Sequence, residues 1–205
     1  MDAKKPSRLK QRNEAKILDA AQKVFAAGSY HGATIEAIAE MAGMSQPNLH
    51  NYFPTKAELY AAVLEQTLNT WLDLIDDLDP QGDPAAELSR YIAQKIELSR
   101  LHPEASRVFA NEILQGAPVL KGHLKTRVRA NVQHFAQVIE AWVAAGRLRR
   151  VDPYALVFMI WAATQHYADF AAQIKAVMDV PRLTAAHFTA AQSSISDIIL
   201  RGLLP

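Results

Sequence analysis

Four side chains within residues 45–52 carry groups suited to contacting nucleic acid. They are Gln46, Asn48, His50 and Asn51. Amide and imidazole groups can donate and accept hydrogen bonds, so they can reach both base edges in the major groove and phosphate oxygens. Leu49 lies among them, and its apolar side chain is expected to anchor the segment to a core. The spacing predicts a helix of about two turns that turns a polar face toward DNA.

The neighbouring residues supply the signals that build and hold this short helix. Thr34 is a good N-cap for a preceding helix, and Gly43 can take the left-handed conformation that ends it. Ser45 then caps the second helix, and Pro47 occupies its first turn, where a missing N–H costs little. Pro54 forces the chain out of the helical region shortly afterwards. Two helices joined by a glycine turn predict a helix-turn-helix, whose second helix enters the major groove.

The rest of the chain predicts an all-α fold, because no alternating β-rich segment interrupts it. Further helices are expected at residues 7–27, 56–78, 84–101, 103–115, 118–145, 153–178 and 181–203. We expect Gly28 to end the first helix, and an interruption near Lys121 and Gly122. The stretch 154–170 is apolar on most sides, and a chain of 205 residues would bury it poorly. It therefore predicts a homodimer through the last two helices.

The composition and motifs argue against an enzyme. The chain has no cysteine, and its seven histidines show no metal-ligand spacing such as HExxH. No nucleophile elbow and no glycine-rich phosphate loop is present. His166 and Asp169 are close enough on a helix to interact, but no nucleophile accompanies them. We therefore predict no catalytic site, no metal and no cofactor.

The N-terminal sequence and the distribution of charge predict a cytoplasmic protein that contacts DNA phosphates. The first residues do not form a signal peptide, and no apolar run approaches the roughly 20 residues needed to span a bilayer. The net charge is only +1, yet residues 1–23 hold seven basic side chains against three acidic ones. A basic N-terminal arm that includes Lys4 and Lys5 suits contacts with DNA phosphates.

A longer pattern covers residues 10–60: Ala20-Ala21, Val24-Phe25, Gly28, residues 31–35, Ile38-Ala39, Ala42-Gly43, Ser45 and residues 51–56. In these residues the chain resembles the TetR family of repressors. The resemblance implies a DNA-binding domain over residues 1–54 and a ligand-binding and dimerisation domain over residues 55–205. It also implies a dimeric repressor that binds a palindromic operator and is released by a small-molecule effector. The DNA-contacting residues would be Thr34, Ser45, Gln46, Pro47, Asn48, His50, Asn51, Tyr52 and Lys56.

The chain departs from the family pattern within the second helix. Gln46 stands where a basic residue is common, and His50 and Asn51 stand where many members carry tyrosines that contact phosphates. Phosphate contacts are therefore expected to be weaker here, or to come from other side chains.

The second half adds a narrower pattern in residues 106–109, 112–114, 116–118 and above all 158–170. It resembles the pyrimidine-utilisation branch of the family, whose members sense uracil or thymine. Trp161 and Gln165 share a helix face, so the indole could stack on a pyrimidine while the amide pairs with an edge bearing N–H and C=O. The ligand-binding residues implied are Trp71, Lys95, Phe109, Glu112, Trp161 and Gln165.

Structural alternatives remain open for these residues. Trp71 and Trp161 could be core aromatics, Gln165 a buried amide at a dimer interface, and Glu112 an ion-pair partner of Arg107. Two other functions also remain open. One is a repressor in the same fold that senses a different aromatic or apolar molecule. The other is a helical adaptor that dimerises without binding DNA.

Overall fold

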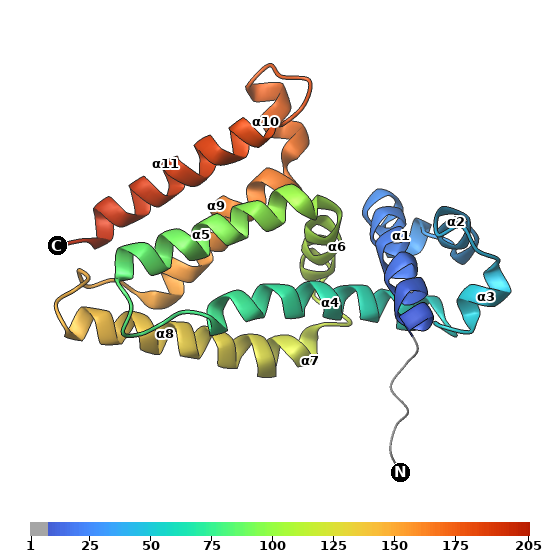
Figure 1. The fold of residues 1–205 in the computed structure, drawn as a ribbon, viewed down its shortest axis with the longest axis horizontal. Helices are drawn as coiled ribbons and strands as arrows, with labels where there is room; N and C mark the ends of the chain where they lie inside the picture. The colour runs from blue at the N-terminus through green and yellow to red at the C-terminus, as the bar shows by residue number, and fades with distance from the viewer. Residues whose placement is uncertain (1–7) are drawn as a thin grey trace, which may run out of the picture.

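The computed structural model describes residues 8–205, and all regular elements in that range are helices, which confirms the all-α prediction. The helices α1 to α3 gather at one end of an elongated molecule (Figure 1). The long helix α4 runs from them into the body, and the C-terminus lies at the opposite end. Lys4 and Lys5 of the basic arm lie outside the described residues. No helix in residues 8–205 combines the length and apolar character needed to cross a membrane.

The first helix, α1, covers Arg8–Gly32 and is bent near its end. The helix was expected to end at Gly28, and the break lies one residue later, at Ser29. Ser29 has φ 55° and ψ −180°, a region that is almost restricted to glycine. The sequence therefore places a glycine one residue before the backbone position that needs one.

We expect Ser29→Gly to stabilise the protein by about 1 kcal/mol. Backbone strain of roughly 1–3 kcal/mol is relieved, while glycine adds only about 0.5–1 kcal/mol of conformational entropy cost. Urea unfolding followed by circular dichroism measures the difference. Ala27→Gly is the matched control, since Ala27 is exposed and has ordinary helical geometry, and it should lose about 1 kcal/mol. Equal losses from both changes would contradict strain at Ser29.

The predicted helix-turn-helix is present. It consists of α2 (Ile35–Met41) and α3 (Gln46–His50), and α4 (Lys56–Asp76) follows. Thr34, Ser45 and Thr55 cap the three helices as expected, and Thr55 forms a reciprocal capping box with Glu58. Gly43 between α2 and α3 has φ 64°, the left-handed conformation that this turn requires.

The body helices are α5 (Pro84–Leu101), α6 (Pro103–Leu114), α7 (Lys121–His123), the π-helical turn η1 (Leu124–Val128), α8 (Arg129–Ala144), α9 (Pro153–Asp169), α10 (Ala171–Val177) and α11 (Ala185–Leu203). Among them α5, α6 and the end of α8 lie close to their predicted bounds. In Figure 1, α6 crosses between α1 and the body, and α11 runs along the outside toward the C-terminus.

Three predicted boundaries in the body are wrong. The helix expected over residues 153–178 is divided at Phe170, which has φ −114° and ψ 27° and stacks on His166 with ring centroids 4.7 Å apart. The last helix begins at Ala185, after Thr184, rather than at residue 181. The interruption expected near Lys121 and Gly122 is instead the π turn that follows them. No proline or glycine marks the Phe170 break, so local punctuation could not reveal it, whereas Gly122 lies two residues before the π turn.

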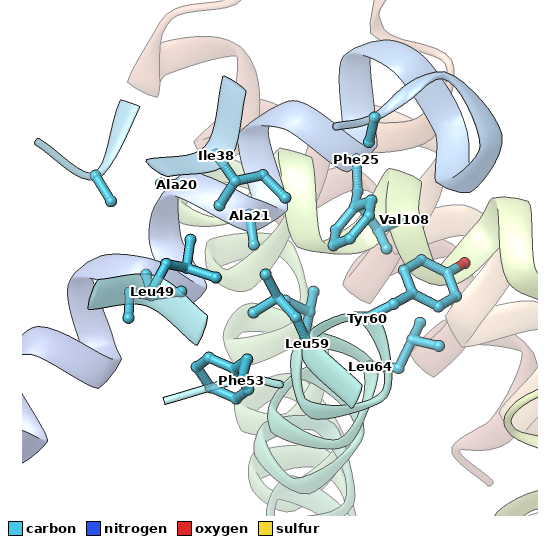
Figure 2. Packing of buried hydrophobic residues seen from close by; sticks show 14 of the residues in the cluster. Ala20, Ala21, Phe25, Ile38, Leu49, Phe53, Leu59, Tyr60, Leu64 and Val108 are labelled. Atoms are coloured by element: carbon cyan, nitrogen blue, oxygen red, sulfur yellow. The ribbon is translucent and has the colours of Figure 1, made fainter. Parts of the chain in front are cut away.

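One apolar core joins the helix-turn-helix to the body. Figure 2 shows Leu49 of α3, Leu59 of α4 and Val108 of α6 among the side chains of this cluster. The cluster continues into Ala117 and Leu120, beyond α6. Full burial of a leucine such as Leu49 contributes roughly 2–3 kcal/mol, so α3 is held firmly despite its length. A second cluster fills the far body between the end of α4 and α5, α8, α9 and α11.

Candidate functional site

The polar residues of α3 form an exposed face at one end of the molecule. Asn48, His50 and Asn51 are exposed and Gln46 is half-buried. Leu49, on the opposite side, is fully buried. The amide of Gln46 donates to Glu36 of α2 at 3.1 Å, which ties the two helices together. The arrangement presents hydrogen-bonding groups on a rigidly supported helix, as base readout requires.

His50 has a defined tautomer. Its Nδ1 lies 3.0 Å from the carbonyl oxygen of Pro54, and a carbonyl oxygen can only accept. Nδ1 therefore carries the proton, which leaves Nε2 of the neutral ring as an acceptor. An acceptor at this place can pair with the amino group of adenine or cytosine.

Thr34 and Ser45 act mainly as helix caps. The Thr34 hydroxyl oxygen accepts from the backbone N–H of Ala37 at 3.2 Å, and that of Ser45 accepts from the N–H of Asn48 at 3.4 Å. Both residues are exposed, so their O–H groups can still donate toward a phosphate. Pro47 is exposed in the first turn of α3.

Tyr52 and Lys56 are more engaged within the protein than their sequence positions indicated. The Tyr52 hydroxyl accepts from the Asn13 amide of α1 at 2.8 Å. The Lys56 ammonium donates to the carbonyl oxygen of Ala33 at 3.0 Å and lies 4.7 Å from the ring centroid of Tyr30. Both side chains are half-buried, so they brace the junction of α1, α2 and α4 beside the polar face.

The described part of the basic arm lies on α1. Its exposed cations are Arg8, Lys10, Arg12 and Lys16. They precede the buried stripe of α1 and leave the N-terminal turns of that helix positively charged, which favours contact with a phosphate backbone.

Three of the proposed ligand-binding residues meet inside the body. Trp71 of α4 and Phe109 of α6 contact edge to face, with ring centroids 4.7 Å apart. The Lys95 ammonium of α5 lies 4.2 Å from the centroid of the Trp71 ring, and the residue is only 2% exposed. Burial lowers the pKa of Lys95 to about 7, and the negative charge of Asp169 opposes this shift only in part.

The sequence reasoning missed Asp169 as a member of this cluster. Its carboxylate accepts from the Ser106 hydroxyl at 2.6 Å and acts electrostatically on Lys95. Burial raises the pKa of Asp169, while the Ser106 hydrogen bond and the Lys95 charge oppose that rise. A signal was present, since Asp169 is the lone acidic residue in the apolar stretch 153–178.

Trp161 and Gln165 lie along α9, on the helix that carries Asp169. The Trp161 indole N–H donates to the hydroxyl of the buried Tyr91 at 2.7 Å, so a ligand could use the ring of Trp161 but not its donor. Gln165 is half-buried. Nearby on α5, the buried Oε1 of Gln94 has no hydrogen-bond partner within residues 8–205. Tyr91 and Gln94 were not singled out from the sequence.

Glu112 is held by partners outside the Trp71 cluster. Its carboxylate accepts from the backbone N–H groups of Val119 and Leu120 at 2.6 and 3.0 Å, and from the Tyr60 hydroxyl at 3.2 Å. These donors turn the carboxylate toward the loop after α6. The alternative of an ion pair with Arg107 is wrong, because the guanidinium of Arg107 pairs with Glu104.

A cavity of about 280 Å³ adjoins the Trp71 cluster between α1 and the body. Its walls include Asp19 and Gln22 of α1, Trp71 of α4, and His102 at the end of α5. A molecule beside Trp71 would therefore reach the helix that supports the helix-turn-helix. Among the described residues, no group of histidine, aspartate and glutamate side chains is arranged to hold a metal ion.

Comparisons with known proteins agree with this geometry. The model for bacterial regulatory proteins of the tetR family matches residues 17–63, and the model for the C-terminal region of YcdC-like proteins matches residues 64–205. The chain is 41% identical over 201 residues to the HTH-type transcriptional regulator RutR of Escherichia coli strain K12, across 98% of this chain and 95% of that one.

Two solved structures share the fold. A bacterial regulatory protein in the tetR family from Rhodococcus RHA1 has a TM-score of 0.74 at 22% identity, over 96% of this chain and 97% of that one. The ketosteroid transcriptional regulator KstR2 of Mycobacterium tuberculosis has a TM-score of 0.71 at 18% identity, over 98% and 97% of the two chains.

Proposed function

The chain belongs to the TetR family of bacterial regulatory proteins, and from that premise we propose that it is a dimeric repressor of a palindromic operator. It is a transcriptional regulator and not an enzyme. A small ligand releases it from DNA, and uracil or thymine is the ligand class that we propose. The observation that carries the proposal is the exposed polar face of α3, capped by Ser45 and fixed by the buried Leu49.

The proposed DNA contacts divide into base readout and backbone positioning. Gln46, Asn48 and His50 read base edges, because they lie on the exposed side of the helix that enters the groove. Backbone contacts come from Thr34, Ser45, Pro47, Asn51, Tyr52 and Lys56, together with the exposed cations of α1. Tyr52 and Lys56 act chiefly by bracing that surface through Asn13 and Ala33.

The proposed dimer forms through α9 and α11. Large apolar side chains are exposed on both helices: Tyr154, Phe158 and Met159 on α9, and Ile198 on α11. An apolar patch of this kind typically marks an interface. A two-fold axis through it would place two α3 helices to read the two halves of a symmetric operator.

The proposed effector site lies around Trp71, Lys95, Phe109, Trp161 and Gln165, with Asp169 added. A pyrimidine offers a flat ring to the indoles and an alternating N–H and C=O edge to the Gln165 amide. Its carbonyl groups would accept from Lys95. Because Trp71 belongs to α4, a ligand that favours one position of this helix shifts the DNA-binding end through differential affinity for two states.

We further propose that residues 1–54 read DNA while residues 55–205 bind the effector and dimerise, and that the protein acts in the cytoplasm, where its operator is. The alternative within the same fold is an effector that is another aromatic or apolar molecule. A helical adaptor without DNA binding is the least consistent alternative, because it leaves the polar face of α3 without a role.

Selection of binding sites from random duplex DNA is expected to enrich a palindrome, and uracil or thymine is expected to release the protein from it. The matched variants are Gln165→Ala and Gln173→Ala, the latter being exposed on α10. Losing the contacts of the half-buried Gln165 amide should weaken the pyrimidine response about tenfold in the first variant alone. Fluorescence anisotropy measures binding and release.

The outcomes separate the three functions. If no sequence is enriched at moderate salt, the remaining function is the helical adaptor that dimerises without binding DNA. Enrichment without release by either pyrimidine would leave a repressor with another effector. An equal response from Gln165→Ala and Gln173→Ala would remove Gln165 from the site.

A further inference from the structure

A second cavity lies where the helix-turn-helix meets the body. Its volume is about 290 Å³, and its walls include Tyr30 and His31 at the end of α1, Tyr60 in α4, Glu112 and Gln115 near the end of α6, and Val119. None of its lining residues belongs to the Trp71 cluster. This cavity is therefore a second candidate binding site, separate from the Trp71 cluster.

Aromatic rings form one side of this cavity. The ring centroids of Tyr30 and Tyr60 are 4.9 Å apart, and Phe25 packs behind Tyr60 at the same distance. The Tyr30 ring already accommodates a cation, since the Lys56 ammonium lies 4.7 Å from its centroid. Aromatic faces attract positive charge through the quadrupole of the ring.

The other side holds a buried carboxylate that lacks a counter-ion. Glu112 is 2% exposed, and within residues 8–205 no lysine, arginine or histidine forms an ion pair with it. Three neutral donors contact it, of which Oε2 receives only the Tyr60 hydroxyl. A carboxylate offers about four acceptor sites, and buried charges are normally paired. Burial and the charge of Glu112 together raise the pKa of Tyr60, so this hydroxyl stays a donor to the carboxylate.

We propose that this cavity binds an organic monocation, an amine or quaternary ammonium ion that carries apolar groups. The positive centre lies between the Glu112 carboxylate and the tyrosine faces, and the apolar groups cover Val119 and neighbouring surface. An inorganic cation would leave the apolar lining of the cavity uncovered, and a neutral molecule would leave the Glu112 carboxylate without a counter-ion.

Because of the position of this cavity, a bound ligand could change how the helix-turn-helix sits relative to the body. Tyr30 and His31 lie at the end of α1, which precedes the helix-turn-helix, and Tyr60 lies in the early turns of α4, which follows it. Gln115 and Val119 come from the body. A cation that binds one relative position of these parts more tightly favours that position. This consequence for DNA affinity rests on the proposed function, whereas the binding itself does not.

Isothermal titration calorimetry without DNA tests the site directly. The probes are benzyltrimethylammonium and choline, and 3,3-dimethylbutan-1-ol is the neutral isostere of choline. We expect wild type to prefer choline over the isostere at least tenfold. Glu112→Gln, which keeps the shape and removes the charge, should abolish that preference.

A second pair of variants keeps the test informative if Glu112→Gln folds poorly. Gln115→Glu adds a carboxylate to the wall at an exposed position and should tighten choline binding severalfold. Gln133→Glu makes the same change at an exposed position of α8 and should leave the affinity unchanged. Equal binding of choline and its isostere would overturn the proposal. So would equal affinities for Gln115→Glu and Gln133→Glu.

Discussion

Phe158→Asp is expected to yield a monomer whose affinity for the palindromic operator is lower by about 100-fold or more. Phe158 is 54% exposed, so the charge is tolerated in the monomer, but it would be buried in the proposed dimer. A monomer contacts one half-site and loses the gain of about 10²–10⁴ that two linked contacts provide. Sedimentation velocity reports the assembly, and fluorescence anisotropy reports the affinity.

Val177→Asp is the matched control, because Val177 is an apolar residue of α10 that is 80% exposed and lies outside the proposed interface. It should remain dimeric with wild-type affinity. A dimeric Phe158→Asp protein that binds the operator normally would move the interface away from α9. Loss of the dimer without loss of operator affinity would refute the need for two linked half-sites.

Replacing the buried Lys95 with methionine is expected to produce a large, pH-dependent change in stability. Burial lowers the pKa of Lys95 to about 7, against an ordinary value of 10.5. Near pH 7 the folded state therefore bears most of the penalty for a buried ammonium. Lys95→Met removes this penalty. We therefore expect the free energy of unfolding of the variant to exceed that of wild type by most at neutral and lower pH.

The direction follows from proton binding. Between pH 7 and pH 10.5 the unfolded wild-type chain still holds a proton that the folded chain has lost, so the free energy of unfolding rises with pH. At 1.36 kcal/mol per pH unit, the window corresponds to roughly 3–5 kcal/mol. The difference in stability between variant and wild type should narrow by that amount as the pH rises.

Urea unfolding at several pH values from neutral to about 10 measures this slope. Lys125→Met, at an exposed position, tests whether loss of any lysine charge would change how the free energy of unfolding depends on pH. Parallel curves for wild type and Lys95→Met would show that the ammonium is not buried as the fold places it. A matching slope change in Lys125→Met would attribute the effect to net charge instead.

Features encoded by local chemistry were predicted well from the sequence. Thr34, Ser45 and Thr55 cap their helices because a side-chain oxygen satisfies N–H groups only a few residues away. The helix-turn-helix follows from these caps and from Gly43. By contrast, the break at Phe170 depends on tertiary packing, since no local breaker is present.

The same distinction applies to the candidate site. The exposed face of α3 follows from helical periodicity, so Asn48 and His50 were placed correctly on the surface, whereas Gln46 is half-buried against Glu36. The partners of the internal residues come from distant helices. Trp161 meets Tyr91, and Lys95 is influenced by Asp169 on another helix. Such pairings depend on the topology, which explains why the partners of Glu112, namely Tyr60 and the backbone of the loop after α6, could not be predicted from the sequence.

The apolar core that the helix-turn-helix shares with the near part of the body limits how this protein could have evolved. Leu49 of the DNA-binding domain shares it with Leu59, Val108, Ala117 and Leu120, all of which come from residues 55–205. If recombination exchanged only residues 1–54 with those of a relative, the side chains of this shared core would no longer pack against one another. New operator specificity is therefore more accessible through point changes on the outer face of α3 than through the shuffling of modules.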